Sequence, residues 1–308
     1  MHLKQLIGDM STSDNHRLRR ARIHQGWWRA FVLKLEQGEH PINPDKTICS
    51  SLPAAAADSS NFISAEIGAL AMCVAQEHKA SKERAGIIDI KRLTGNLLTS
   101  QAVCFNFFGM LALDHDLGLR VVQAFYPDVT AFTGVNFEYA PAPKADFTND
   151  NSAFDVALEV MIGEEEGLIG FECKYTEDFS PTPYEQAQYR KIYSASANFN
   201  ATYEELTASR FNQLFRNQLI AESLLQSGRK KFVKTGLFCA PDDVAAKNTA
   251  SAFSQFVKSD FKVIDFFDYI VAIQKLLITP RQREQTMLLW ARYLAHELSA
   301  AAAAEFYS

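Results

Sequence analysis

Apolar and polar residues follow two kinds of spacing along the chain, and these predict helices at both ends and strands in the middle. Helical spacing predicts helices over residues 21–37, 65–82, 96–113, 209–226, 245–257 and 281–299, with a further helical stretch from Tyr184. Short apolar runs predict strands over residues 121–125, 134–139, 154–159, 170–175 and 232–240, and another near Val263. Residues 41–58 predict a loop, and the alanines near Ala300 predict a frayed terminus.

The segments 154–159 and 170–175 are predicted to pair as a β-hairpin, because an acidic turn between two glycines joins them. Side chains alternate between the two faces of a strand, so Glu172 and Lys174 share one face and their neighbours point the other way. Charges inside an apolar strand are costly unless they are paired or bind a metal. Together with Asp155 they would form a divalent-cation site beside a cationic group.

The register of this hairpin decides which carboxylate faces Glu172. A turn centred symmetrically in the acidic segment would place Glu159 opposite Glu172. A turn shifted toward Gly163, or a bulge, would place Asp155 there instead. Asp155 and Glu159 lie on the same strand face, so both are candidates for the site.

Three more polar residues are candidates for the same site. Glu138 lies in the neighbouring strand, Gln101 in the preceding helix, and Gln213 on a polar face of helix 209–226, away from its apolar side. Simple surface or capping roles are the alternatives for Glu138 and Gln101.

The Glu-x-Lys spacing alone is not diagnostic. Residues 77–79 repeat it, and residues 89–91 and 260–262 match the looser Asp-x-Lys form. With ordinary amounts of charged residues, a chain of this length should contain about one such match by chance. Only residues 172–174 follow a strand that carries an acidic residue. A structural ion pair is the alternative interpretation of this motif.

An Asp, a spacer and Glu-x-Lys on the next strand resemble the PD-(D/E)XK nuclease superfamily, the restriction-endonuclease-like fold. The flanking segments 97–109 and 172–177 resemble a bacterial group of uncharacterised restriction-endonuclease-like proteins, and the resemblance covers roughly residues 95–240. Phe154 stands where the superfamily has a Pro before the Asp.

This resemblance implies an α/β fold: a restriction-endonuclease-like core with a central mixed β-sheet flanked by helices, plus an N-terminal helical extension. The predicted order of helix, strands, helix and strand fits that core. We expect residues 1–90 to form the extension and residues 91–308 to form the nuclease-like domain.

The resemblance also implies a function, the Mg²⁺-dependent hydrolysis of DNA, with Mn²⁺ as a substitute metal. Asp155 and Glu172 would hold the ion, the Cys173 carbonyl would be a third ligand, and Lys174 would position and activate the attacking water. The alternative is a protein that keeps the fold with an inactive site and serves in nucleic-acid binding or assembly. The net charge of −5 favours that alternative.

Composition agrees with a globular enzyme and identifies no other chemistry. The 308 residues are 47% apolar and 22% charged, enough for a sizeable core. The sequence has no membrane-length apolar run and no signal-peptide pattern, so we expect a cytoplasmic protein. The five cysteines are spread out and predict reduced core residues, and the scattered histidines argue against a zinc site. A homodimer is left open.

A nuclease must neutralise phosphates locally, and the densest basic segment lies near the N-terminus. We predict that this segment contacts DNA and forms a wall of the cleft, with aromatic stacking from Trp27 and Trp28. The alternative is a solvated helix face whose tryptophans are buried in the core. The predicted DNA-binding residues are Arg17, Arg19, Arg20 and Arg22.

Overall fold

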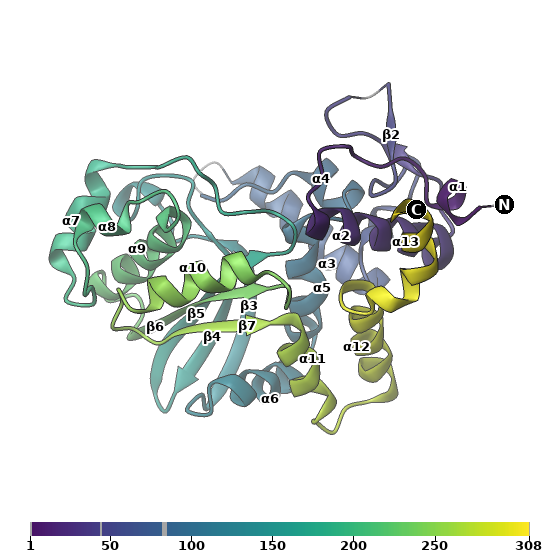
Figure 1. The fold of residues 1–308 in the computed structure, drawn as a ribbon. Helices are drawn as coiled ribbons and strands as arrows, with labels where there is room; N and C mark the ends of the chain where they lie inside the picture. Colours follow the sequence, from purple (N-terminus) through teal and green to yellow (C-terminus); the bar gives the residue numbers. More distant parts are fainter. Residues whose placement is uncertain (1, 44, 82–84, 308) are drawn as a thin grey trace.

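A five-stranded mixed β-sheet forms the centre of the protein in this computed structural model, which describes residues 2–43, 45–81 and 85–307 (Figure 1). The strands lie in the order β3-β4-β5-β6-β7; β3, β4 and β5 pair antiparallel, and β5, β6 and β7 pair parallel. Their bounds are β3 Ala131–Tyr139, β4 Phe154–Ile162, β5 Glu165–Lys174, β6 Phe232–Cys239 and β7 Phe261–Asp265. The predicted α/β fold with a mixed central sheet is confirmed.

Helices cover both faces of this sheet (Figure 1). On one face lie α5, α6 and α11, which bring Phe107 and Phe108 against Phe238 of β6. On the other face lie α9 and α10, with α7 packed on α9. The bounds are α5 Ser100–Leu113, α6 His115–Phe125, α11 Phe266–Gln274, α7 Ala187–Ala195, α8 Tyr203–Leu206, α9 Asn212–Gln226 and α10 Val244–Ser254.

The two ends of the chain meet beside the sheet (Figure 1). His24 of α2 is hydrogen-bonded to Ser299 and to the Ala291 carbonyl, and α3 packs on α5 within the main core. The division into two domains at residue 90 stays a prediction. The bounds are α1 Leu3–Ile7, α2 His16–Trp27, the π-helix η1 Trp28–Leu33, β1 Gly38–Glu39, β2 Thr47–Ile48, α3 Ala65–Ala80, α4 Ile90–Gly95, α12 Pro280–Tyr293 and α13 Ala300–Tyr307, with short 3-10 helices at Asp58–Asn61, Lys144–Asp146 and His296–Ser299.

Two predicted elements are wrong. Residues 121–125 are the end of helix α6, because Leu117, Val121 and Val122 recur at helical spacing and are buried, while Asp114 caps the helix start. The alanine-rich end is not frayed, because it forms α13, whose buried Phe306 packs in a cluster with residues of α1 and α2. The first error comes from reading a short apolar run without the helical spacing and cap that precede it, and the second from tertiary packing, which orders the end of the chain.

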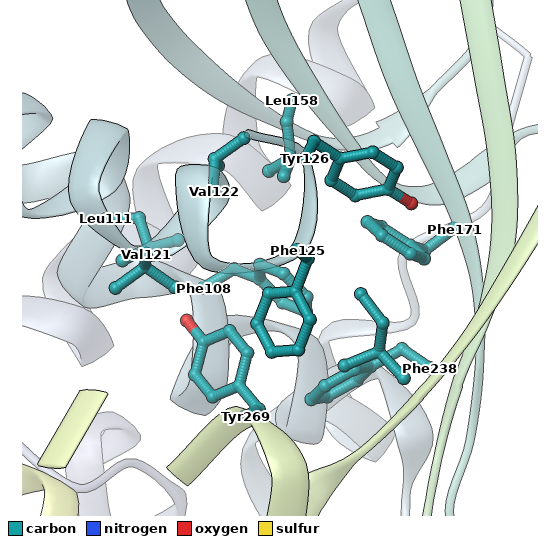
Figure 2. A pocket seen from close by; sticks show the side chains of 11 residues that line it. Phe108, Leu111, Val121, Val122, Phe125, Tyr126, Leu158, Phe171, Phe238 and Tyr269 are labelled. Carbon is teal, nitrogen blue, oxygen red and sulfur yellow. The ribbon is translucent and has the colours of Figure 1, made fainter. Parts of the chain in front are cut away.

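A small internal cavity of about 20 Å³ lies between the sheet and helices α5, α6 and α11 (Figure 2). Apolar and aromatic side chains such as Phe108, Val122 and Phe171 line it. This volume is comparable to that of a single water, so the cavity is a packing feature of the core and cannot hold a nucleotide. Within the described residues, no helix has the length and apolar character needed to cross a bilayer.

Candidate active site

The register of the β4–β5 hairpin brings Asp155 and Glu172 together. Val156 pairs with Phe171, and the strands continue in this register to Ile162, which pairs with Glu165. The turn is therefore shifted toward Gly163, whose φ of 62° is the left-handed conformation that glycine adopts without strain. Extending the same register places Asp155 opposite Glu172. The Asp155 carboxylate accepts a hydrogen bond of 2.6 Å from the Cys173 backbone N–H.

The other candidate on this strand, Glu159, lies away from the site. It pairs with Leu168, four residues along β4 from Asp155, which corresponds to about 13 Å. Its carboxylate forms an ion pair with Lys230 and accepts a hydrogen bond from Asn136. The symmetric turn that would have placed Glu159 opposite Glu172 is not the one the chain forms.

Glu172 and Lys174 form a buried ion pair that helix α9 holds in place. The Lys174 Nζ lies 3.0 Å from Glu172 Oε1 and 3.2 Å from Gln213 Oε1. The Gln213 amide donates to Glu172 Oε1 at 3.1 Å, and the Asn217 amide donates to Oε2 at 2.9 Å. Gln213 and Asn217 are four residues apart, so they lie on one face of α9 and reach the same carboxylate. Gln213 therefore contacts both charged groups of the motif.

Glu138 brings a third carboxylate to the same end of the sheet. It lies at the end of β3 with φ of 48°, a strained left-handed conformation for a residue with a side chain. The Gln101 amide donates to Glu138 Oε1 at 2.8 Å, and the Gln101 Oε1 is buried with no hydrogen-bond partner among the residues that the structure describes. Gln101 thus positions Glu138 and does not itself contact Asp155 or Glu172.

The charges of these groups act on one another. Burial raises the pKa of Asp155 well above its ordinary value, and repulsion from Glu172 and Glu138 raises it further. Burial, together with repulsion from Glu172, raises the pKa of Glu138 to about 7 against the hydrogen bond from Gln101. Burial disfavours the Lys174 ammonium, but the charges of Glu172 and Asp155 outweigh this effect, so the pKa of Lys174 is raised and the group stays protonated. The metal-free site therefore favours protons on Asp155 and Glu138, because one ammonium does not balance three carboxylates in a buried place.

The loop that follows β5 covers the ion pair. The side chain of Phe179 lies over Lys174, with the Nζ 4.8 Å from the ring centroid, and the Ser180 N–H donates to Gln213 Oε1 at 2.8 Å. Only 6% of Glu172 and 5% of Lys174 is exposed, whereas Asp155 and Glu138 are partly exposed. The site is therefore exposed to solvent on the side of Glu138 on β3 and Asp155 on β4.

The predicted DNA-binding arginines are held by groups of the protein itself. Arg17 is paired with Asp243 at 2.7 Å, and Arg20 is paired with Asp242. These contacts tie α2 to the segment before α10. Arg22 is ion-paired with Asp14 at 2.5 Å and donates a hydrogen bond to the Ser50 hydroxyl. The guanidinium of Arg19 lies over the ring of Tyr307. The contacts give the segment a bracing role, and its contact with DNA stays a prediction.

A divalent ion such as Mg²⁺ prefers oxygen ligands and keeps several of its waters, so two carboxylates are enough to hold it. The oxygens of Asp155 and Glu172 fit this requirement, and a bound cation would favour the ionised forms of the carboxyl groups that burial and repulsion disfavour. The described residues contain no ready cluster of three His, Cys, Asp or Glu side chains in ligating geometry. The further protein ligand that the sequence predicts is the carbonyl of Cys173, which stays a prediction.

Sequence reasoning missed two residues that shape this site. Asn217 lies four residues after Gln213 on the same polar helix face, and this spacing was the available signal. Phe179 lies in a loop between Thr176 and Pro181, and its contact with Lys174 has no signal in the sequence.

The fold and this constellation define a nuclease-like protein of the restriction-endonuclease type. In agreement, residues 12–295 match the profile of the PD-(D/E)XK nuclease superfamily. The chain belongs to this superfamily, as the resemblance of its sequence predicted. Comparison with curated proteins and with solved structures gave no match. The match extends across residue 90, so it includes most of the N-terminal helices.

Proposed function

We propose that this protein is a Mg²⁺-dependent nuclease that hydrolyses phosphodiester bonds in DNA, with Mn²⁺ as a substitute metal. The observation that carries the proposal is the meeting of Asp155 and Glu172 across one hairpin with Lys174 beside them. Three carboxylates share this end of the sheet, counting Glu138, and burial together with their mutual repulsion raises the pKa of Asp155 and of Glu138. Such an arrangement is costly to fold and is typical of sites that bind a cation.

Each residue has a distinct role in this proposal. Asp155 and Glu172 would hold the ion, and a bound ion would polarise the phosphate and offset charge on the leaving oxygen. Lys174 stays an ammonium, so it orients the attacking water or a phosphate oxygen by donating hydrogen bonds and does not remove a proton. Glu138 has a pKa near neutrality and is the carboxylate best suited to exchange a proton with water there.

Nicking of supercoiled plasmid DNA in Mg²⁺ tests the proposal, with linear and single-stranded DNA as further substrates. We expect the wild type to cleave and Lys174→Ala to bind DNA without cleaving it. Lys230→Ala is the matched control, because Lys230 pairs with Glu159 at the other end of the same hairpin. Full cleavage by Lys174→Ala would contradict the role given to Lys174, and loss of cleavage in both lysine variants would indicate a general effect of charge.

A catalytically inactive nucleic-acid-binding or assembly protein is the second candidate, and one observation favours it. Protein donors contact both oxygens of Glu172, and Phe179 covers Lys174, so the ion pair is satisfied without an ion. Thermal melting with and without Mg²⁺ or Mn²⁺ distinguishes the two candidates. An ion at a hundredfold its Kd adds about 2.7 kcal/mol to stability. No shift in melting and no nicking would favour the inactive protein. A cytoplasmic location and a homodimer stay predictions of the sequence.

A further inference from the structure

Arg216 lies beside the candidate active site on the helix that builds it. It is three residues after Gln213 and one before Asn217, the two amides that hold Glu172. Side chains three apart on a helix have Cβ atoms about 5–6 Å from each other. Arg216 therefore flanks the face of α9 that contacts the motif.

The guanidinium of Arg216 has no carboxylate partner among the described residues. Its Nε is buried without a hydrogen bond, and every ion pair found in the described segments joins other residues. Burial and Asp150 raise the pKa of Tyr189 and Arg216 lowers it, so both charged groups lie near this tyrosine. The Asp150 carboxylate, however, accepts hydrogen bonds from Tyr189 and Ser152. The guanidinium of Arg216 is partly buried and lacks an anion among the described residues, and a phosphate would supply the missing charge and hydrogen-bond acceptors.

The aromatic ring that Arg216 contacts is that of Tyr184. The Arg216 Cζ lies 5.4 Å from the centroid of the Tyr184 ring, and half of this tyrosine, 50%, is exposed. The Asn212 amide donates to the Tyr184 carbonyl at 2.9 Å, so the first turn of α9 anchors the residue. An exposed aromatic ring beside an arginine is the combination that binds single-stranded nucleic acid, with the ring stacking on a base and the arginine contacting the backbone.

Arg190 is an arginine whose charge is balanced by carboxylates of the protein. Arg190 lies over the ring of Tyr203 at 4.1 Å, a cation–π contact like that of Arg216. Arg190 is, however, ion-paired with Glu185 at 3.1 Å and with Glu204 at 3.2 Å. Two carboxylates already balance its charge, so it provides a matched control.

We propose that Arg216 and Tyr184 form a subsite for an unpaired nucleotide next to the scissile phosphate, which rests on the proposed nuclease function. Arg216 binds the backbone phosphate and Tyr184 stacks on the base. Bases in a duplex are already stacked on each other, so a half-exposed ring reaches a base face only where the strand is single or opened. The substrate class is thus single-stranded DNA or DNA with an unpaired stretch at the cleavage site.

Binding of fluorescently labelled single-stranded DNA and of the matching duplex, measured by anisotropy in EDTA so that nothing is cleaved, tests this subsite. With Arg216→Ala we expect the log–log salt slope for the single strand to fall by about 0.7, the value for one phosphate. Arg216→Lys should keep the slope, and Arg190→Ala should leave it unchanged. Tyr184→Ala should weaken single-strand binding about 5- to 150-fold and duplex binding much less, whereas Tyr184→Phe should bind as the wild type does.

The outcomes separate this inference from the proposed function. If the wild type nicks DNA in Mg²⁺ but Arg216→Ala and Tyr184→Ala bind the single strand normally, the subsite is refuted and the nuclease stands. If the wild type nicks nothing but the two variants lose single-strand binding as expected, the subsite stands and the nuclease fails. Equal losses for Arg216→Ala and Arg190→Ala would also refute the subsite, because they would reflect net charge alone. Melting temperatures of all variants check that each is folded.

Discussion

Replacing Glu138 by Gln should stabilise the metal-free protein at high pH. The pKa of Glu138 is raised from 4.5 to about 7, so the folded protein holds this proton more tightly than the unfolded chain does. Stability is then lost as the pH rises from about 4.5 to about 7, and the full loss persists above that range. At 1.36 kcal/mol for each pH unit, the ionised Glu138 costs about 3 kcal/mol. Gln keeps an acceptor for Gln101 and carries no charge, so the variant avoids this cost.

Free energies of unfolding from urea titrations in EDTA, at about pH 4.5 and about pH 8, check this reasoning. The variant and the wild type should have similar stability at the lower pH, and the variant should be more stable by about 3 kcal/mol at the higher pH. Glu159→Gln is the control, because Glu159 is ion-paired with Lys230 and its loss should not stabilise the protein. Equal stability of Glu138→Gln and wild type at about pH 8 would refute the electrostatic argument, as would the same difference at both pH values.

Three further predictions concern the supports of the site. Asn217→Ala removes a hydrogen bond to the buried Glu172 and should cost about 1–3 kcal/mol of stability in metal-free protein, as measured by urea titration. A loss below about 0.5 kcal/mol would mean that another group replaces the amide. Phe179→Ala uncovers Lys174 and should speed acylation of that amine by a small reagent, followed by peptide mass spectrometry. An unchanged rate would show that the ring does not limit access. Arg17→Ala leaves the buried Asp243 without its ion-pair partner and should lower stability by about 3 kcal/mol, seen as a lower Tm. An unchanged Tm would argue against the bracing role of the arginine segment.

Local spacing in the sequence determined most of the elements and the core of the motif. Glu172 and Lys174 must share a strand face because side chains alternate with a period of two. The amphipathic pattern of residues 209–226 and the apolar runs of the hairpin predicted α9, β4 and β5, although β5 begins five residues before the predicted strand. These features depend on residues close in sequence, so their signal lies in the sequence itself.

The tertiary structure decided how these pieces meet. The turn at Gly163 selected Asp155 over Glu159 as the partner of Glu172, although both share a strand face. The packing of α9 on the sheet brought Asn217 to the carboxylate of Glu172, 45 positions earlier in the chain. The position of α2 places Arg17 in an ion pair with Asp243 instead of in solvent. Each of these contacts joins segments far apart in the chain, where the free energy depends on burial and charge at the meeting point. Spacing along the sequence therefore identified the motif, and packing determined its register, its supports and its access.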